Sequence, residues 1–252
     1  MTTMHRLLSV LFFAISLPAA MRAGGKSELN KSGQCLVVLT DNWDATNGMV
    51  RTFERNKATG TWKDRGPAFP VVVGKKGLGQ GLGLVAIEFK GAPMKKEGDN
   101  KAPAGIFRLS SAFGYAPRRS ARWIRLPYVA LSKETEGIDD PKSRYYTQLV
   151  DRSKIAHPDW RSSEQMLRKD VLYKWGVVVE HNARAIPGAG SCIFLHIWKD
   201  SSSATAGCTA MREKDLVALL RWLDPKRRPV LIQMPRAEYA RLRIKYELPG
   251  DR

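Results

Sequence analysis

"CIFLHIWKDSSSATAGCTAM" (Cys192–Met211) is the stretch on which the interpretation of this chain depends. Its first residues are apolar and partly β-branched, which predicts a strand that ends near His196. A loop of small and polar residues then leads to Gly207 and Cys208. The whole chain has only 4 histidines and 3 cysteines. A histidine and a cysteine in this arrangement could serve covalent chemistry, metal binding or packing, and the rest of the sequence has to decide between these.

Strand-like runs recur along the chain and predict a mainly β fold. Gly, Pro, Asn or Asp residues flank most of these runs, as expected for strands joined by turns. Two helices are also predicted. "SSEQMLRKD" from Ser162 begins with a capping box, and "REKDLVALLRWLD" from Arg212 places its leucines on one face. The predicted strands are Cys35–Thr40, Met49–Arg55, Phe69–Val73, Leu84–Phe89, Val171–Glu180, Cys192–Trp198 and Val230–Met234.

Two further stretches lie between these elements. The polar residues 126–160, with several prolines and tyrosines, predict a long ordered excursion. "GKKGLGQGLG" (Gly74–Gly83) follows a predicted strand, but it matches neither common phosphate-binding glycine motif and no helical pattern follows it. A tight hairpin that relies on glycine is therefore the better prediction for this stretch.

The charge balance and the N-terminus together indicate an exported protein. Lys and Arg number 42 against 24 Asp and Glu, so the net charge of +18 predicts an anionic environment or partner. No nucleic-acid-binding motif accompanies this charge, so no nucleic acid is expected. Residues 1–23 have a short basic start, an apolar run and then small residues, which is the architecture of a signal peptide. We expect a periplasmic or cell-wall-associated protein without a stable membrane span after signal cleavage.

Export makes the odd number of cysteines informative, because at least one thiol then has no partner within the chain. The sequence context indicates Cys208 as that thiol. Cys35 and Cys192 each lie in an apolar, strand-like run. They could be buried free thiols or a disulfide pair, and the sequence leaves both possibilities open.

A zinc site is one hypothesis for the histidine and the cysteines. His181, Cys192, His196 and Cys208 supply four ligands of the type that zinc prefers. Their spacing is irregular, however, and no two of them form one of the close pairs that mark common zinc motifs. The sequence therefore favours a site without metal.

A nucleophilic cysteine is the competing hypothesis, and it needs only a base within reach. A histidine at the end of one strand can meet a cysteine on the following loop, and His196 would then lower the pKa of the Cys208 thiol below that of a free cysteine. Gly207 would leave the backbone free to direct N–H groups at an oxyanion. Asn182, His181 or a backbone carbonyl could orient the histidine.

"TAGCTAM" (Thr205–Met211), with His196 upstream, resembles the signature of the L,D-transpeptidase catalytic domain, also called the YkuD domain: a histidine, then [ST]-x-G-C. "KKEGDNKAPAGIFRL" (Lys95–Leu109) resembles the glycine-acidic stretch and the [TA]-P-x-G-x-F pattern of that family. "EHNARAIPGAGSCIFLHIW" (Glu180–Trp198) resembles its strand pair with the catalytic histidine. The resemblance implies a β-sandwich or mixed sheets with a few short helices.

The departures from the family pattern mark a divergent branch. Ile197 stands where many members have glycine, Ala206 where many have histidine, and Ala210 where many have arginine. The resemblance implies that the family arginine helps hold a substrate carboxylate or the active-site loop, and Arg212 could replace it by position. We expect a catalytic domain over residues 30–235 and a basic C-terminal tail over residues 236–252.

The resemblance implies a peptidoglycan L,D-transpeptidase without metal or cofactor. Cys208, activated by His196, would take the acyl group of a stem tetrapeptide as a thioester and pass it to an amine. Backbone N–H groups near Gly207 would stabilise the oxyanion. Thr205, Arg212 and Asn182 would be the substrate-binding residues, and peptidoglycan stem peptides the partner. Two alternatives remain: an L,D-carboxypeptidase that uses the same pair, and a catalytically silent cell-wall-binding module.

Overall fold

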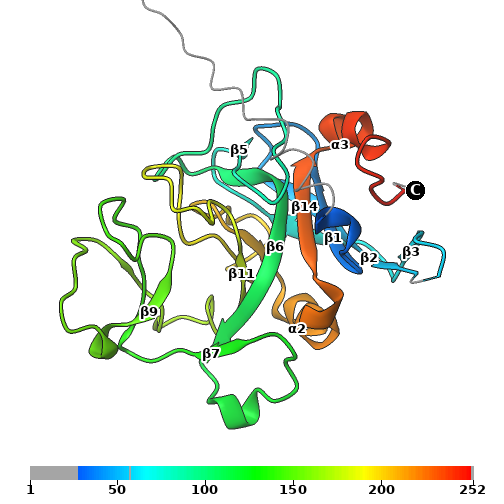
Figure 1. The fold of residues 1–252 in the computed structure, drawn as a ribbon. Helices are drawn as coiled ribbons and strands as arrows, with labels where there is room; N and C mark the ends of the chain where they lie inside the picture. Colours follow the sequence, from blue (N-terminus) through cyan, green and yellow to red (C-terminus); the bar gives the residue numbers. More distant parts are fainter. Residues whose placement is uncertain (1–27, 57, 251–252) are drawn as a thin grey trace, which may run out of the picture.

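The structure is a computed structural model, and it describes residues 28–56 and 58–250 (Figure 1). The expected signal peptide, residues 1–23, lies outside the described residues. Strands dominate the described part of the chain and helices are few, so the predicted mainly β class is confirmed. In the described residues, no helix combines the length and the apolar character that crossing a bilayer requires.

Most strands join one mixed sheet, which closes on itself because its first and its eighth strand also pair with each other. A closed sheet leaves few unpaired edges, and it encloses a core between its own walls. The order is β1 (Gln34–Thr40), β14 (Val230–Pro235), β6 (Ala102–Gly114), β11 (Trp175–Val179), β12 (Phe194–Ile197), β13 (Thr209–Met211), β4 (Phe69–Val72), β2 (Asn47–Arg55) and then β3 (Trp62–Asp64). The short strands β5 (Leu78–Gln80) and β7 (Tyr128–Ala130) add to β6.

The sequence pattern explains why the central strands lie where they do. Every residue of β1 and of β14 is buried, and a continuous apolar run is the pattern of a strand that is covered on both faces. Helix α2 (Glu213–Trp222) covers one end of this region below β14 (Figure 1). It confirms the helix predicted from Arg212, and Leu216, Leu219 and Leu220 are buried as its apolar face predicts.

The glycine-rich stretch forms the expected tight turn. Gly74 and Gly77 form an antiparallel bridge, in which the N–H of Gly77 donates to the carbonyl of Gly74 at 2.8 Å. Gly77 has a φ of 70°, and a Cβ at that position would overlap the carbonyl oxygen of Trp43. Only glycine combines this backbone conformation with so close an approach.

The strand predicted over Leu84–Phe89 is wrong. Val85, Ile87 and Phe89 are buried, so the alternating pattern is real, but the segment joins no strand ladder. Its backbone is held instead by single bonds, such as the one from the N–H of Leu84 to the carbonyl of Ile106 at 2.7 Å. The alternation of apolar residues indicates which side chains are buried. A strand also needs a neighbouring strand as hydrogen-bonding partner.

The helix predicted from Ser162 is also wrong. Glu164–Gln165 form strand β10, which pairs with β8 (Thr135–Gly137) and through it with β9 (Leu149–Asp151) in a separate small sheet. The Ser162 hydroxyl donates to Asp139 at 2.6 Å, and the Gln165 amide donates to the carbonyls of residues 133 and 135. Both side chains of the expected capping box thus make tertiary bonds instead of local ones.

Strands β8 and β9 of this small sheet lie in the excursion that the polar residues 126–160 predict, β10 follows it, and the sheet stands to one side of the main sheet (Figure 1). The first part of the expected basic C-terminal tail, residues 236–252, is helical. Arg236–Arg243 form helix α3, whose Tyr239 and Leu242 are buried in the main core. Residues 28–30 are also helical, and three short 3-10 turns are η1 (Arg118–Ser120), η2 (Arg152–Lys154) and η3 (Pro225–Arg227).

Candidate active site

Strands β12 and β13 bring His196 and Cys208 to the same face of the sheet. The two strands are parallel, and His196 lies opposite Ala210. Cys208 precedes β13 and is two residues before Ala210. Because side chains alternate along a strand, residues two apart point the same way. The two predicted site residues are therefore diagonal neighbours on adjacent strands.

The His196 ring is oriented by a backbone carbonyl. Its Nδ1–H donates to the carbonyl of Ile197 at 2.7 Å, so the proton of the neutral ring is on Nδ1 and Nε2 is left as the basic nitrogen. Of the three orienting partners that the sequence leaves open, the structure thus shows the backbone carbonyl. Only 7% of the residue is exposed, and this burial lowers the pKa of His196 to about 4.

Cys208 is held at the start of β12. The N–H of Phe194 donates to its Sγ at 3.3 Å, and the carbonyl of Cys192 lies 3.6 Å from the same sulfur. Burial raises the pKa of the Cys208 thiol to about 12, with Glu164 adding to the rise, while the Phe194 N–H and Lys95 oppose it. The expectation of a pKa below that of a free cysteine is therefore wrong for this state, because desolvation outweighs the favourable neighbours.

Thr205 fixes the shape of the loop that carries the cysteine. Its hydroxyl donates to the carbonyl of Cys208 at 2.6 Å and accepts the N–H of Gly207 at 3.1 Å. A Cβ on Gly207 would lie 3.2 Å from the carbonyl oxygen of Lys101, closer than an ordinary contact. The loop is thus tightly closed, and Gly207 is needed because the 101 backbone approaches it.

His196 and Cys208 line one cavity of about 660 Å³. Thr205 and Gly207 line it too, so the structure brings together four of the predicted site residues. Asp139 of the excursion, and Glu164 and Arg168, which follow the excursion in the chain, also line this cavity. Charged groups of both signs therefore surround the buried histidine and cysteine.

An aromatic cluster forms part of the wall. Tyr173 packs edge-on against His196, with ring centroids 5.3 Å apart, and also against Phe113 and Phe194. Its hydroxyl donates to Glu164 at 2.7 Å. Gly176 on β11 leaves the space for the Phe113 ring, because a Cβ there would overlap it.

Two predicted substrate-binding residues lie outside this cavity. Arg212 caps the N-terminus of α2, where its Nε donates to Asp215 at 2.7 Å. Asn182 is buried, and its side chain bonds the backbone of Ile186 and Gly190. It lines a separate cavity of about 300 Å³. Both residues are engaged in building local structure.

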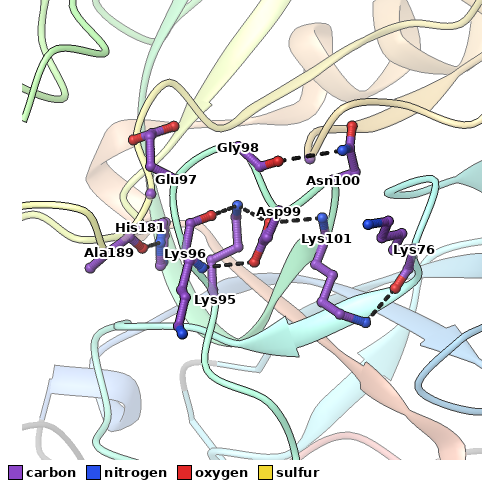
Figure 2. A network of polar contacts seen from close by, with 12 residues as sticks. Lys76, Lys95, Lys96, Glu97, Gly98, Asp99, Asn100, Lys101, His181 and Ala189 are labelled. Carbon is purple, nitrogen blue, oxygen red and sulfur yellow. Dashed lines mark hydrogen bonds and ion pairs between the residues drawn. The ribbon is translucent and has the colours of Figure 1, made fainter.

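His181 is also engaged elsewhere. Its Nδ1 accepts the N–H of Leu82 at 3.2 Å, so its Nε2–H donates to the carbonyl of Ala189 at 2.8 Å (Figure 2). Burial lowers the pKa of His181 to about 4. Both ring nitrogens are thus used, and among the described residues no group of three or more His, Cys, Asp or Glu side chains is placed to hold a metal ion.

The three cysteines are free thiols. Cys35 is in the main core, whereas Cys192 packs against the smaller cluster that includes Phe194 and Cys208. The open question of a Cys35–Cys192 disulfide is therefore answered in favour of separate thiols. Cys192 lies on the cavity wall with a φ of 50°.

Sequence patterns did not reveal the other residues of this cavity. Tyr173, Glu164 and Arg168 lie in stretches without a catalytic or ligand-binding motif, and only folding places them around His196 and Cys208. Lys95 is different, because it begins the "KKEGDNKAPAGIFRL" block that the family resemblance rests on. Its place at the start of this block is a sequence signal that could have indicated it, whereas its burial is visible only in the structure.

The domain is closed and mostly β, and it holds a buried histidine and a buried cysteine next to each other at adjacent strands. A loop presents the cysteine to a cavity. These are the parts that a cysteine acyltransferase needs. The profile of the L,D-transpeptidase catalytic domain (YkuD) matches residues 42–232. The chain therefore belongs to this family. No curated protein and no solved structure matched the chain in the parallel comparisons.

Proposed function

We propose that this protein is a peptidoglycan L,D-transpeptidase with Cys208 as nucleophile and His196 as base. One observation carries the proposal: both residues line the same cavity from adjacent strands, with the basic Nε2 of His196 left free by the bond from Nδ1 to Ile197. Membership of the L,D-transpeptidase catalytic-domain family supports the substrate class, a peptidoglycan stem peptide.

The first half-reaction forms a thioester. Nε2 of His196 takes the proton from the Cys208 thiol while Sγ attacks the carbonyl carbon of the L,D-amide after diaminopimelate. A tetrahedral oxyanion forms, which backbone N–H groups at the Gly207–Cys208 turn stabilise. The C–N bond then breaks, and the imidazolium returns the proton to the leaving amine of D-alanine.

The second half-reaction transfers the acyl group. An acceptor amine attacks the thioester carbon, and Nε2 of His196 removes its proton. The C–S bond breaks, the new amide is released, and the proton passes from the imidazolium to the Cys208 thiolate. Water in place of the amine would give a carboxypeptidase, so the acceptor decides between the two activities.

The charged walls of the cavity suit a zwitterionic peptide. The position of the family arginine is occupied here by Ala210, which lines the cavity without a charge. Lys75 and Lys199 are exposed cations on the same cavity, and we assign them the donor carboxylate that the missing arginine would hold. Asp139 and Glu164 line the same cavity and suit an acceptor ammonium.

We also propose that the protein works outside the cytoplasm, in the periplasm or at the cell wall. The signal-like residues 1–23 and the net charge of +18 support this location, because peptidoglycan stem peptides are exported and anionic.

Turnover of purified muropeptides tests the function. The mature protein, given tetrapeptide muropeptides, should release D-alanine and form cross-linked dimers between two diaminopimelate residues. Cys208→Ala should abolish both products, and Ser202→Ala, an exposed change in the preceding loop, should leave them unchanged. Tripeptides without dimers would show that the protein is a hydrolase and not a transferase. If neither product forms, the silent wall-binding module becomes the better interpretation.

A further inference from the structure

Lys95 is a buried cation beside the loop that carries Cys208. Lys95 is the only buried residue among the lysines and arginines that the structure describes, with 3% of its side chain exposed. Its Nζ donates to Asp99 and to the carbonyl of Lys96, both at 2.6 Å (Figure 2). Moving an ammonium group out of water costs free energy, so a buried lysine indicates a specific structural or functional role.

The side chain of Lys95 lies beside Gly207, the residue that precedes Cys208. Its Cε lies 3.9 Å from where a Cβ on Gly207 would be, and 3.3 Å from where a Cβ on Gly190 would be. Lys95 also lines the cavity with Cys208. The absence of a side chain at Gly190 leaves space for Lys95, and the lysine lies within ordinary contact distance of the Gly207 position next to the nucleophile.

Asp99 shapes the loop that delivers Lys95. Besides the ammonium, its carboxylate accepts the N–H of Lys96 at 2.7 Å and the N–H of Lys101 at 2.9 Å. Figure 2 shows these bonds converging on Asp99. The same loop brings the carbonyl of Lys101 against Gly207. One carboxylate thus fixes both the cation and the backbone that border the nucleophile.

We propose that Lys95 is an electrostatic positioning residue for Cys208, whose ammonium stabilises the negative charge that forms on Sγ when His196 removes the thiol proton. Asp99 holds the ammonium in place and limits its effect by partial neutralisation. The proposal rests on the proposed function of the cysteine, and it explains how a buried neutral pair can produce a thiolate without a carboxylate behind the histidine.

The other charged groups of the cavity do not replace Lys95. The acids are Glu97, Asp139 and Glu164, of which Glu164 raises the pKa of the Cys208 thiol. The remaining cations are Lys75, Arg168 and Lys199. Lys75 and Lys199 are exposed to solvent, which screens them, and Arg168 is bonded to Asp170. The favourable charge on the Cys208 thiol comes from Lys95.

The alternative is that the ion pair of Lys95 and Asp99 only stabilises the loop that carries it. Two variants of this ion pair separate the two cases. Lys95→Met removes the cation and should raise the pKa of Cys208. Asp99→Asn removes the neutralising charge and should lower it. If the ion pair only stabilises the loop, both variants should change the pKa of Cys208 in the same direction. Lys95→Arg should restore wild-type behaviour, and Lys96→Met removes an exposed lysine from the same loop as a matched control.

The measurement is the rate of Cys208 alkylation by iodoacetamide against pH, followed on the Cys208 peptide by mass spectrometry in the full mature chain. One pKa unit changes the thiolate fraction about tenfold. We expect Lys95→Met to slow alkylation at pH 8 about tenfold, Lys96→Met to leave it unchanged and Asp99→Asn to accelerate it. Thermal melts confirm that each variant is folded.

The proposal is overturned if folded Lys95→Met reacts like the wild type, or if Lys95→Met and Asp99→Asn slow alkylation equally. Alkylation needs no peptidoglycan, so this result does not depend on the muropeptide assay. A protein that fails that assay but shows the opposite shifts would keep Lys95 as the positioning residue of a thiol with another acyl substrate.

Discussion

The ring of Tyr173 meets the ring of His196 edge-on, with centroids 5.3 Å apart and planes at 77°. The carbonyl of Ile197 fixes the same imidazole from its Nδ1 side. In the described part of the chain, an aromatic edge and a backbone carbonyl thus orient the base. Burial lowers the pKa of His196, although the bond to the Ile197 carbonyl opposes this shift, so the neutral imidazole is the form that this site stabilises.

The aromatic contact predicts a difference between two substitutions of Tyr173. Tyr173→Phe keeps the ring edge and loses only the bond to Glu164, so kcat should stay within a few-fold of wild type. Tyr173→Leu removes the edge and should lower kcat more than tenfold with less change in KM, because the base loses its orientation. Steady-state release of D-alanine measures both. Equal losses in the two variants would show that the hydroxyl, and not the ring, matters.

Thr205 provides a second matched pair. Thr205→Ser keeps the hydroxyl that bridges Gly207 N–H and the Cys208 carbonyl, whereas Thr205→Val keeps the volume and loses both bonds. Each bond contributes about 1 kcal/mol, so Thr205→Val should lower kcat roughly tenfold or more and Thr205→Ser should not. The same D-alanine assay applies. A Thr205→Val enzyme with wild-type kcat would mean that the loop keeps its shape without the hydroxyl.

The lowered pKa of His196 predicts the acid side of the pH–rate profile. The imidazole must be unprotonated to accept the thiol proton, so activity is lost as the pH falls through the pKa of about 4, and not near 6.5. The profile of kcat/KM against pH measures this limb, and Glu164→Gln separates the nearby carboxyl, whose pKa burial raises. A limb near pH 6.5 that persists in Glu164→Gln would contradict a buried neutral histidine.

His181 should make the fold sensitive to acid. Its pKa is about 4 when folded against about 6.5 unfolded, so the unfolded chain binds more protons in this window. The stabilisation is complete above pH 6.5 and is lost as the pH falls towards 4, with about 2 kcal/mol lost at pH 5. His181→Gln can keep both backbone bonds without titrating. Urea unfolding at pH 7 and pH 5 should show the smaller loss in the variant, and equal losses would contradict the assignment.

The sequence predicted the parts of this structure that depend on local pattern. The strand that ends near His196, the following loop and Cys208 lie within one short stretch, so their residue types and spacing carried the information. The leucine face of α2 was predictable for the same reason, since its period is local.

Features that depend on tertiary partners were not predictable. Gln165 completes a capping box by pattern, but its amide donates to the carbonyls of residues 133 and 135 instead. Asn182 suggested substrate binding by type, yet it bonds its own loop at a φ of 54°. The raised pKa of Cys208 follows from burial, which a sequence does not display.

Intact-mass analysis of acylation at Cys208 tests the central claim most directly. The mature protein, incubated with a tetrapeptide donor without acceptor or with a carbapenem, should gain one acyl group: the donor less D-alanine, or the whole opened β-lactam. Digestion should place the adduct on the Cys208 peptide, and Cys208→Ala should gain nothing. Folded wild-type protein that stays unmodified by both reagents, or that carries the adduct on Cys35 or Cys192, would contradict the account.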